Sequence, residues 1–108
     1  MVAKHKEFIV PLDDTNQLRL QITTDQGQVV DFVVQYETLD SGRLVAVVRY
    51  DASHGHGHRD LLDGRGNQIE KRWMPEHYSL KQCLSEGEHD LRTNWRVYRE
   101  RFLRSFNQ

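Results

Sequence analysis

The sequence has one cysteine, no long apolar run and no excess of charge of either sign. Cys83 by itself cannot form an internal disulfide. No stretch reaches the roughly 20 apolar residues that cross a membrane, and the first residues lack the apolar core of a secretion signal. These absences exclude a disulfide framework and a membrane-spanning helix. They predict a cytoplasmic protein that does not interact with membranes.

Charge, length and missing motifs narrow the function classes further. The 108 residues carry 15 Lys and Arg against 16 Asp and Glu, so a strongly basic nucleic-acid coat and an acidic tail are both excluded. The length suits one core, and we expect residues 1–108 to form a single domain. Phosphate-binding loops, dinucleotide-binding glycine motifs, HExxH, CxxC and GxSxG are all missing. The common nucleotidase, dehydrogenase, zinc protease and hydrolase classes therefore lack support.

Alternating apolar and polar residues predict a sheet within residues 1–75. Leu18, Leu20 and Ile22 alternate with polar residues, and the pattern returns over residues 29–36 after a turn at 25–27, which predicts a hairpin. Further strands are expected over residues 6–12, 44–50 and 68–73. The strand over 44–50 is apolar on nearly both faces, which indicates a central position.

Residues 79–106 predict one long C-terminal helix. Ser79 and Gln82 have the spacing of a capping box. Gly87 interrupts the helical pattern and predicts a kink or break. Apolar residues recur at helical spacing and form a stripe that can cover a sheet: Leu80, Leu84, Leu91, Trp95, Tyr98, Phe102 and Phe106. We therefore expect an α+β fold, a five- or six-stranded, mostly antiparallel meander sheet with this helix packed on it.

A histidine- and aspartate-rich segment, residues 51–63, is the feature most suggestive of chemistry. Imidazole changes charge near neutral pH and is the commonest metal ligand. In an extended segment His54, His56, His58 and Asp60 would point to the same side. Histidines two residues apart, about 6.6 Å along a strand, can share an ion, whereas His54 and His58, about 13 Å apart, need a bend at the glycines. The segment thus offers a divalent-metal site with candidate ligands His54, His56, His58 and Asp60, completed by Asp51 or Asp63.

A metal-free alternative uses His54 and His58 as an acid and base pair that cleaves RNA through its own 2′-hydroxyl. Asp51 or Asp60 would orient an imidazole. A bidentate guanidinium would hold the phosphate, and the candidates are Arg49 and Arg59. The remaining interpretation is a polar turn between two strands. The residues alone leave all three open.

The helix carries a weaker candidate surface. Arg92, Arg96 and Arg99 share one flank and could bind phosphate or an acidic partner. Basic residues late in a helix also complement its dipole as a solvated face, and that interpretation is favoured here. Trp95 and Tyr98 are predicted to lie in the core.

The stretch from Val47 to Asp60 resembles an uncharacterised family of short prokaryotic proteins with an Arg-Tyr-Asp, His-Gly and His-x-Asp core. The similarity runs from the N-terminal strands to the helix around Asn94 and Trp95. More distantly, the stretch resembles the TumE-type toxins of toxin-antitoxin pairs. The resemblance implies an uncharacterised domain with a site of Arg49, Tyr50, Asp51, His54, His58 and Asp60, to which His56 is an addition. The distant similarity implies a toxin acting on RNA, with a cognate antitoxin as partner.

These observations give two functional hypotheses. In the first, the protein binds or cleaves a phosphodiester such as RNA. Its catalytic residues are then His54, His58, Asp51 and Asp60, and its binding residues are Arg49, Tyr50 and Arg59. In the second, the protein is a non-catalytic module in which the cluster binds a divalent metal and the arginines of the helix bind a protein partner.

Overall fold

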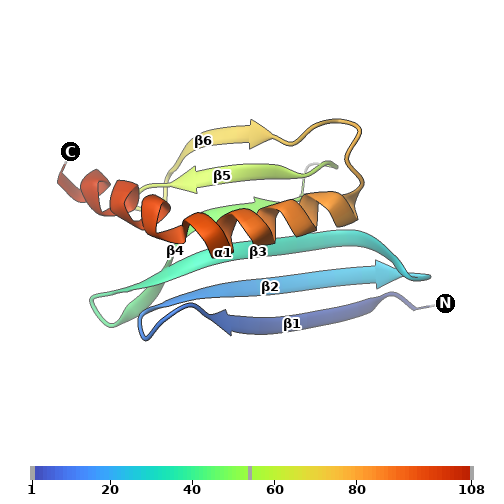
Figure 1. Ribbon diagram of the computed structural model, residues 1–108, viewed down its shortest axis with the longest axis horizontal. Coiled ribbons are helices and arrows are strands. Elements are labelled where there is room, and N and C mark those ends of the chain that lie inside the picture. The colour runs from blue at the N-terminus through green and yellow to red at the C-terminus, as the bar shows by residue number, and fades with distance from the viewer. Residues whose placement is uncertain (1, 54, 108) are drawn as a thin grey trace.

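The computed structural model describes residues 2–53 and 55–107 as six strands, a long helix and a short 3₁₀ helix (Figure 1). The elements are β1 (Lys4–Pro11), β2 (Asn16–Asp25), β3 (Gln28–Asp40), β4 (Arg43–Asp51), β5 (His58–Leu62), β6 (Gln68–Trp73), α1 (Leu80–Arg104) and η1 (Ser105–Asn107). The strands lie in the order β1-β2-β3-β4-β5-β6, and each is antiparallel to its neighbours. The predicted α+β meander is confirmed, with six strands.

Two tight turns fix the register of the central hairpins. Gln26 and Gly27 connect β2 to β3, and Ser41 and Gly42 connect β3 to β4, all four with positive φ. Two successive residues with positive φ match the right-handed twist of the flanking strands, which is why glycine occupies the second position of each turn. The hairpin expected from residues 17–36 is present and is longer than its apolar pattern indicated.

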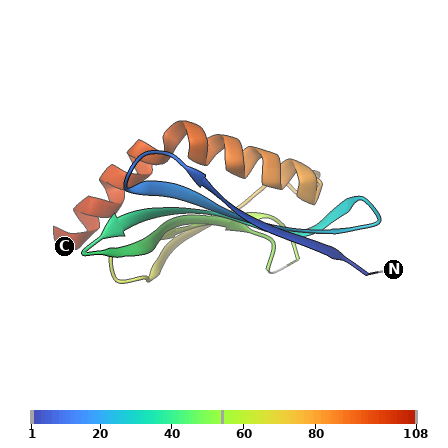
Figure 2. The same ribbon diagram turned by 90° about the horizontal axis from the view of Figure 1, so that it is seen from below.

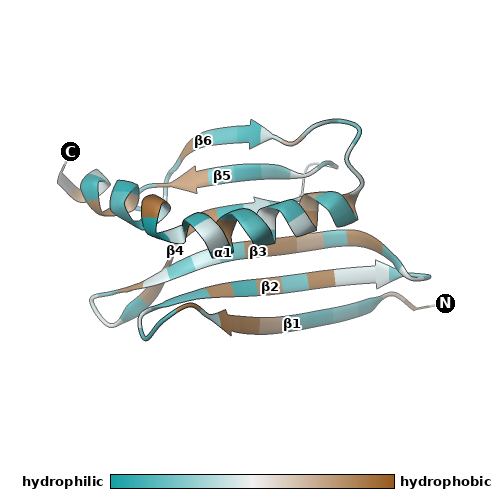
Figure 3. Ribbon diagram, in the orientation of Figure 1, coloured by the Kyte–Doolittle hydropathy of each residue, from teal (hydrophilic) through white to brown (hydrophobic). Residues whose placement is uncertain are grey.

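The core lies between the sheet and α1, which covers one face (Figure 2). Leu18, Leu20 and Val34 of the sheet are fully buried, as is Leu91 of the helix. The ring of Trp95 meets Tyr36 edge to face at 5.9 Å. Apolar and polar residues alternate along β2, and the outward side of α1 is mostly hydrophilic (Figure 3). No second layer of the described residues covers the sheet face opposite α1, which we call the open face.

The helix begins where its capping box predicts. Ser79 Oγ accepts from the Gln82 amide, and Gln82 Oε1 accepts from the Ser79 amide. The helix ends at Arg104 instead of Phe106, because the chain tightens there into η1, and Phe106 is half exposed. None of the helices in the described ranges is long and apolar enough to cross a membrane.

The break expected at Gly87 is not present, since α1 runs from Leu80 to Arg104 as one continuous helix. Gly87 instead allows a close approach to the sheet. A Cβ atom there would lie 2.8 Å from Cγ of Tyr50, which is closer than real Cβ atoms come to a neighbour. The glycine is therefore explained by its packing against Tyr50 of β4.

Candidate functional site

The histidine- and aspartate-rich segment forms its site through the pairing of β4 with β5. Arg49 lies opposite Asp60, Tyr50 opposite Arg59, and Asp51 opposite His58. Because side chains alternate along a strand, the two outer pairs share one face and the middle pair lies on the other. Tyr50 contacts residues of α1, so the outer pairs lie on the open face.

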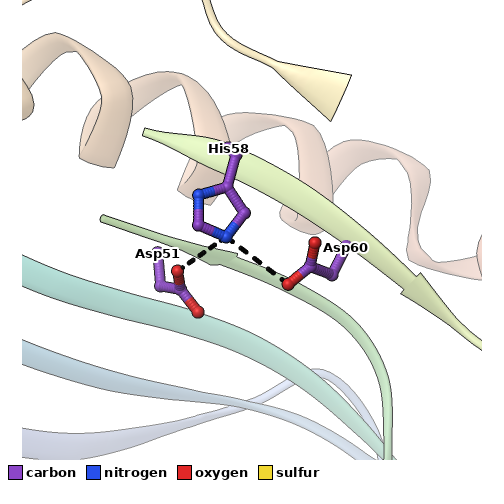
Figure 4. A group of neighbouring side chains, drawn as sticks. All are labelled: Asp51, His58 and Asp60. Atoms are coloured by element: carbon purple, nitrogen blue, oxygen red, sulfur yellow. Dashed lines mark ion pairs between the residues drawn. The ribbon is translucent and has the colours of Figure 1, made fainter. Parts of the chain in front are cut away.

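Three side chains on the open face form a compact group that we call the Asp-His-Asp trio: Asp51, His58 and Asp60 (Figure 4). His58 Nε2 lies 2.9 Å from Asp51 Oδ1 and 3.5 Å from Asp60 Oδ2. All three residues are buried, and His58 is completely inaccessible to solvent. A buried pair of carboxylates around one imidazole is costly to assemble unless a cation or a hydrogen-bond donor compensates it.

The polar atoms of the trio differ in how many hydrogen-bond partners they have. Asp51 Oδ1 accepts from the amide and the hydroxyl of Ser53, at 3.2 and 3.0 Å. His58 Nδ1 lies 3.3 Å from the His56 carbonyl oxygen. Asp60 Oδ1 is buried and has no hydrogen-bond partner among the described residues. A buried carboxylate oxygen without a protein donor is a position that a water, a ligand or an ion can complete.

The trio fits the dimensions of a metal site. Its three ligand atoms lie within 4.8 Å of one another. Atoms bound to one ion at about 2.1 Å lie roughly 3 to 4 Å apart, so coordination needs only small side-chain adjustments. A ligating histidine usually directs its second ring nitrogen at a carbonyl or carboxylate, as His58 does with His56.

Cations and an aromatic ring surround the trio on the open face. Arg49 and Lys71 lie on either side of Asp60 in the strand register. Arg49 Nε donates to Gln35 Oε1 at 2.7 Å. The half-exposed Trp73 ring meets the His58 ring edge to face at 5.0 Å. Sequence reasoning missed Lys71 and Trp73, because they join the site only through the pairing of β5 with β6.

Among the described residues, the segment between β4 and β5 is not an extended strand. β4 ends at Asp51 and β5 begins at His58, and the Gly55 amide donates to the Ala52 carbonyl in a turn between them. His56 lies apart from the trio, with its Nε2 2.9 Å from the Pro75 carbonyl oxygen. The condition of an extended segment is therefore not met between β4 and β5, although His58 and Asp60 do share one face of β5. His54, the other predicted member, lies outside the described residues.

Two predicted binding residues, Tyr50 and Arg59, lie on the helix face and do not join the trio. The Tyr50 hydroxyl donates to Asp90 Oδ2 at 2.6 Å, and the Tyr98 hydroxyl donates to the same oxygen at 2.5 Å. Arg59 donates to the Tyr98 hydroxyl and to Glu70. This network borders a cavity of about 320 Å³. Asp90 was missed, because no local pattern connects a helix position with a strand 40 residues earlier.

The electrostatics of Asp90 follow from its hydrogen bonds. Burial raises its pKa, but donation from Tyr50, Tyr98 and Asn94 outweighs burial, so the pKa of Asp90 lies below its usual value. Burial, reinforced by the bond to Asp90, raises the pKa of the Tyr50 and Tyr98 hydroxyls. The network thus holds a charged carboxylate between two neutral phenols.

This arrangement predicts acid-sensitive stability. The pKa of Asp90 in the folded protein lies below the unfolded value of about 3.9. The carboxylate therefore adds to the free energy of unfolding above that value, and this contribution is lost as pH falls through the folded pKa. The difference in unfolding free energy between the natural protein and Asp90→Asn should therefore be largest near neutral pH and shrink below about pH 4. Urea denaturation at several pH values measures it, with Asp14→Asn as an exposed control. A difference that stays constant down to pH 3 would contradict the prediction.

The predicted arginine flank of α1 is mostly engaged within the helix. Arg92 Nε donates to Glu88 at 2.7 Å, and the Arg96 guanidinium lies 4.4 Å from the centre of the Trp95 ring. Trp95 is buried, as predicted, and Tyr98 is half buried. These contacts agree with a solvated helix face.

The fold and the trio define an α+β meander protein with a buried carboxylate and imidazole group on its open face. The model of one family, described as a domain of unknown function (DUF7718), matches residues 3–108, and the chain belongs to that family. This confirms the predicted membership of an uncharacterised family, whereas the comparison shows no similarity to TumE-type toxins. No curated protein and no solved structure matches the chain.

Proposed function

We propose that the Asp-His-Asp trio binds a divalent transition-metal ion and that this ion serves in binding and cleaving a phosphodiester. The observation that carries the proposal is the buried, unpartnered Asp60 Oδ1 beside two further ligand atoms within coordinating distance. Two carboxylates and one imidazole suit zinc, manganese, iron or cobalt better than calcium or a thiolate-preferring ion.

Three protein ligands leave coordination positions for water or substrate, as catalytic metal sites require. A bound ion would polarise a phosphoryl oxygen and lower the pKa of a coordinated water. Arg49 and Lys71 flank Asp60 and bring two positive charges to the position where an anionic substrate would approach. The pair of cations beside the trio thus supports a phosphodiester as the substrate.

The metal-free acid and base mechanism has less support. A general base must place a ring nitrogen within hydrogen-bond reach of the substrate. His58 is completely buried, and its two nitrogens face the oxygens of Asp51, Asp60 and His56. The geometry therefore favours His58 as a ligand over His58 as a proton carrier. We propose RNA as the phosphodiester, so that the protein would cleave RNA as an RNA-directed toxin does.

Metal binding and cleavage can be measured on the same samples. Protein dialysed against EDTA is titrated with Co²⁺, followed by visible absorption and calorimetry. We expect one ion per chain, and Asp60→Asn or Asp51→Asn should weaken binding by at least about 100-fold, because each removes a ligand charge. His56→Ala, whose side chain lies outside the trio, is the matched control. Circular dichroism verifies that each variant is folded.

The second readout is cleavage of a labelled RNA oligonucleotide by the same EDTA-dialysed proteins, supplied with Mn²⁺. The natural protein and His56→Ala should shorten it, and Asp60→Asn should not. Absence of stoichiometric Co²⁺ binding by the folded natural protein would overturn the metal site. Co²⁺ binding without shortening of RNA would overturn the cleavage step and favour the non-catalytic metal-binding module.

A further inference from the structure

A second cavity lies where β4 and β5 stop pairing. Their ladder ends at Val48 and Leu61, and beyond that point the cavity occupies the space between the first half of β4 and the β5–β6 turn. Its volume is about 520 Å³. We call it the arginine cleft, because Arg43, Arg49 and Arg65 line it.

The charges of the cleft leave an excess of positive groups. Asp40 and Asp63 are its acidic residues. Asp63 Oδ1 accepts from the amides of Arg65 and Asn67, so this carboxylate is already engaged in the turn. No acidic side chain within 4 Å pairs with Arg43 or Arg65 in the described part of the chain, and both are exposed. The cleft is therefore suited to an anion.

Arg49 is positioned to act as the phosphate donor. Its Nε is held by Gln35 Oε1 at 2.7 Å, and its terminal nitrogens have no hydrogen-bond partner among the described residues. A guanidinium fixed at one nitrogen and available at the other two is preorganised for bidentate contact with a phosphate. Arg49 also lies opposite Asp60, so this arginine both lines the cleft and borders the trio.

Part of the lining of the cleft is apolar. Val45, Leu62 and Phe102 line it together with the three arginines. Apolar walls with a few convergent polar groups and a volume of roughly 300 to 1,000 Å³ are typical of small-molecule sites. A nucleotide combines the two required features, a flat base for the apolar part of the lining and a phosphate for the arginines.

We infer that the arginine cleft binds a nucleotide unit, with its phosphate at Arg43, Arg49 and Arg65. A role for the cleft in the reaction rests on the proposed function. When one nucleotide of a phosphodiester occupies the cleft, its scissile phosphate would lie beyond Arg49, next to the trio. The cleft itself does not depend on a metal.

Calorimetry and amide NMR with AMP as the probe, in EDTA, test the cleft separately from the metal. AMP should bind the natural protein and shift the amide signals of Arg43, Gly64 and Gly66. Adenosine, which lacks the phosphate, should bind at least about tenfold more weakly. The variant Arg43→Ala/Arg65→Ala should lose at least about tenfold in AMP affinity. The matched control Arg92→Ala/Arg96→Ala removes the same charge from the outer face of α1 and should bind as the natural protein does.

The outcomes separate this inference from the proposed function. AMP binding that persists in Asp60→Asn and falls in Arg43→Ala/Arg65→Ala supports the cleft, whether or not Co²⁺ binds. Three results would overturn it: no AMP binding by the natural protein, equal loss in both arginine double variants, or binding that requires Mn²⁺ and disappears in Asp60→Asn. The last result would place the nucleotide at the trio alone.

Discussion

Replacing His58 by alanine is expected to lower the unfolding free energy of the metal-free protein by about 3 kcal/mol or more. The substitution removes a fully buried ring and leaves the carboxylates of Asp51 and Asp60 together without the imidazole between them. Breaking a buried ionic group by deleting one partner is costly, because the remaining charges stay desolvated. Urea denaturation in EDTA, followed by circular dichroism, measures the change. His89→Ala, at an exposed helix position, should remain within about 0.5 kcal/mol of the natural protein.

A compensating variant shows whether buried charge causes the loss of stability in His58→Ala. Adding Asp51→Asn and Asp60→Asn to His58→Ala removes the uncompensated charges while leaving the cavity. We expect much of the lost stability to return, with no return of Co²⁺ binding. A triple variant as unstable as His58→Ala would show that packing and not charge dominates, and a stable His58→Ala protein would contradict the electrostatic account of the trio.

Phe102→Ala is expected to cost about 3 to 5 kcal/mol of unfolding free energy. Phe102 is 1% exposed at the C-terminal end of α1, and its ring packs edge to face on Phe106 at 5.3 Å. Truncation leaves a cavity at the place where the helix holds the β5–β6 turn, since Ser105 Oγ accepts from the Gly64 amide nearby. Phe102 also lines the arginine cleft.

The neighbouring position supplies the control for this prediction. Leu103 is 40% exposed, so Leu103→Ala removes similar apolar volume with little burial and should cost about 1 kcal/mol or less. Urea midpoints compared at equal m-values give both numbers. Similar losses for the two variants would show that the end of α1 is not packed as described.

Local pattern was sufficient for most of the fold. The alternation around Leu18 and Leu20 identifies a half-buried strand, because the side-chain period of a strand is two. Ser79 and Gln82 locate the start of α1, because capping needs only residues three apart. By contrast, Gly87 cannot be interpreted without Tyr50, which approaches from a different element.

The sequence predicted which residues form the trio but not how they are arranged in space. The sequence places Asp51, His58 and Asp60 in one short segment, but the extended row it suggested is replaced by a turn and two paired strands. Strand pairing alone decides that Asp51 meets His58. The same pairing places Tyr50 and Arg59 on the helix face, where Tyr50 donates to Asp90 and Arg59 donates to the Tyr98 hydroxyl.

The amino-acid order determined most of the secondary structure of this protein, since backbone propensity, side-chain period and capping act over a few residues. It also determined which chemical groups the β4–β5 region carries. Only the tertiary structure decided which face each group occupies, which partners complete it and where the arginine cleft opens. The reason is that register and packing depend on contacts between residues distant along the chain, and one residue of slip would exchange the two faces.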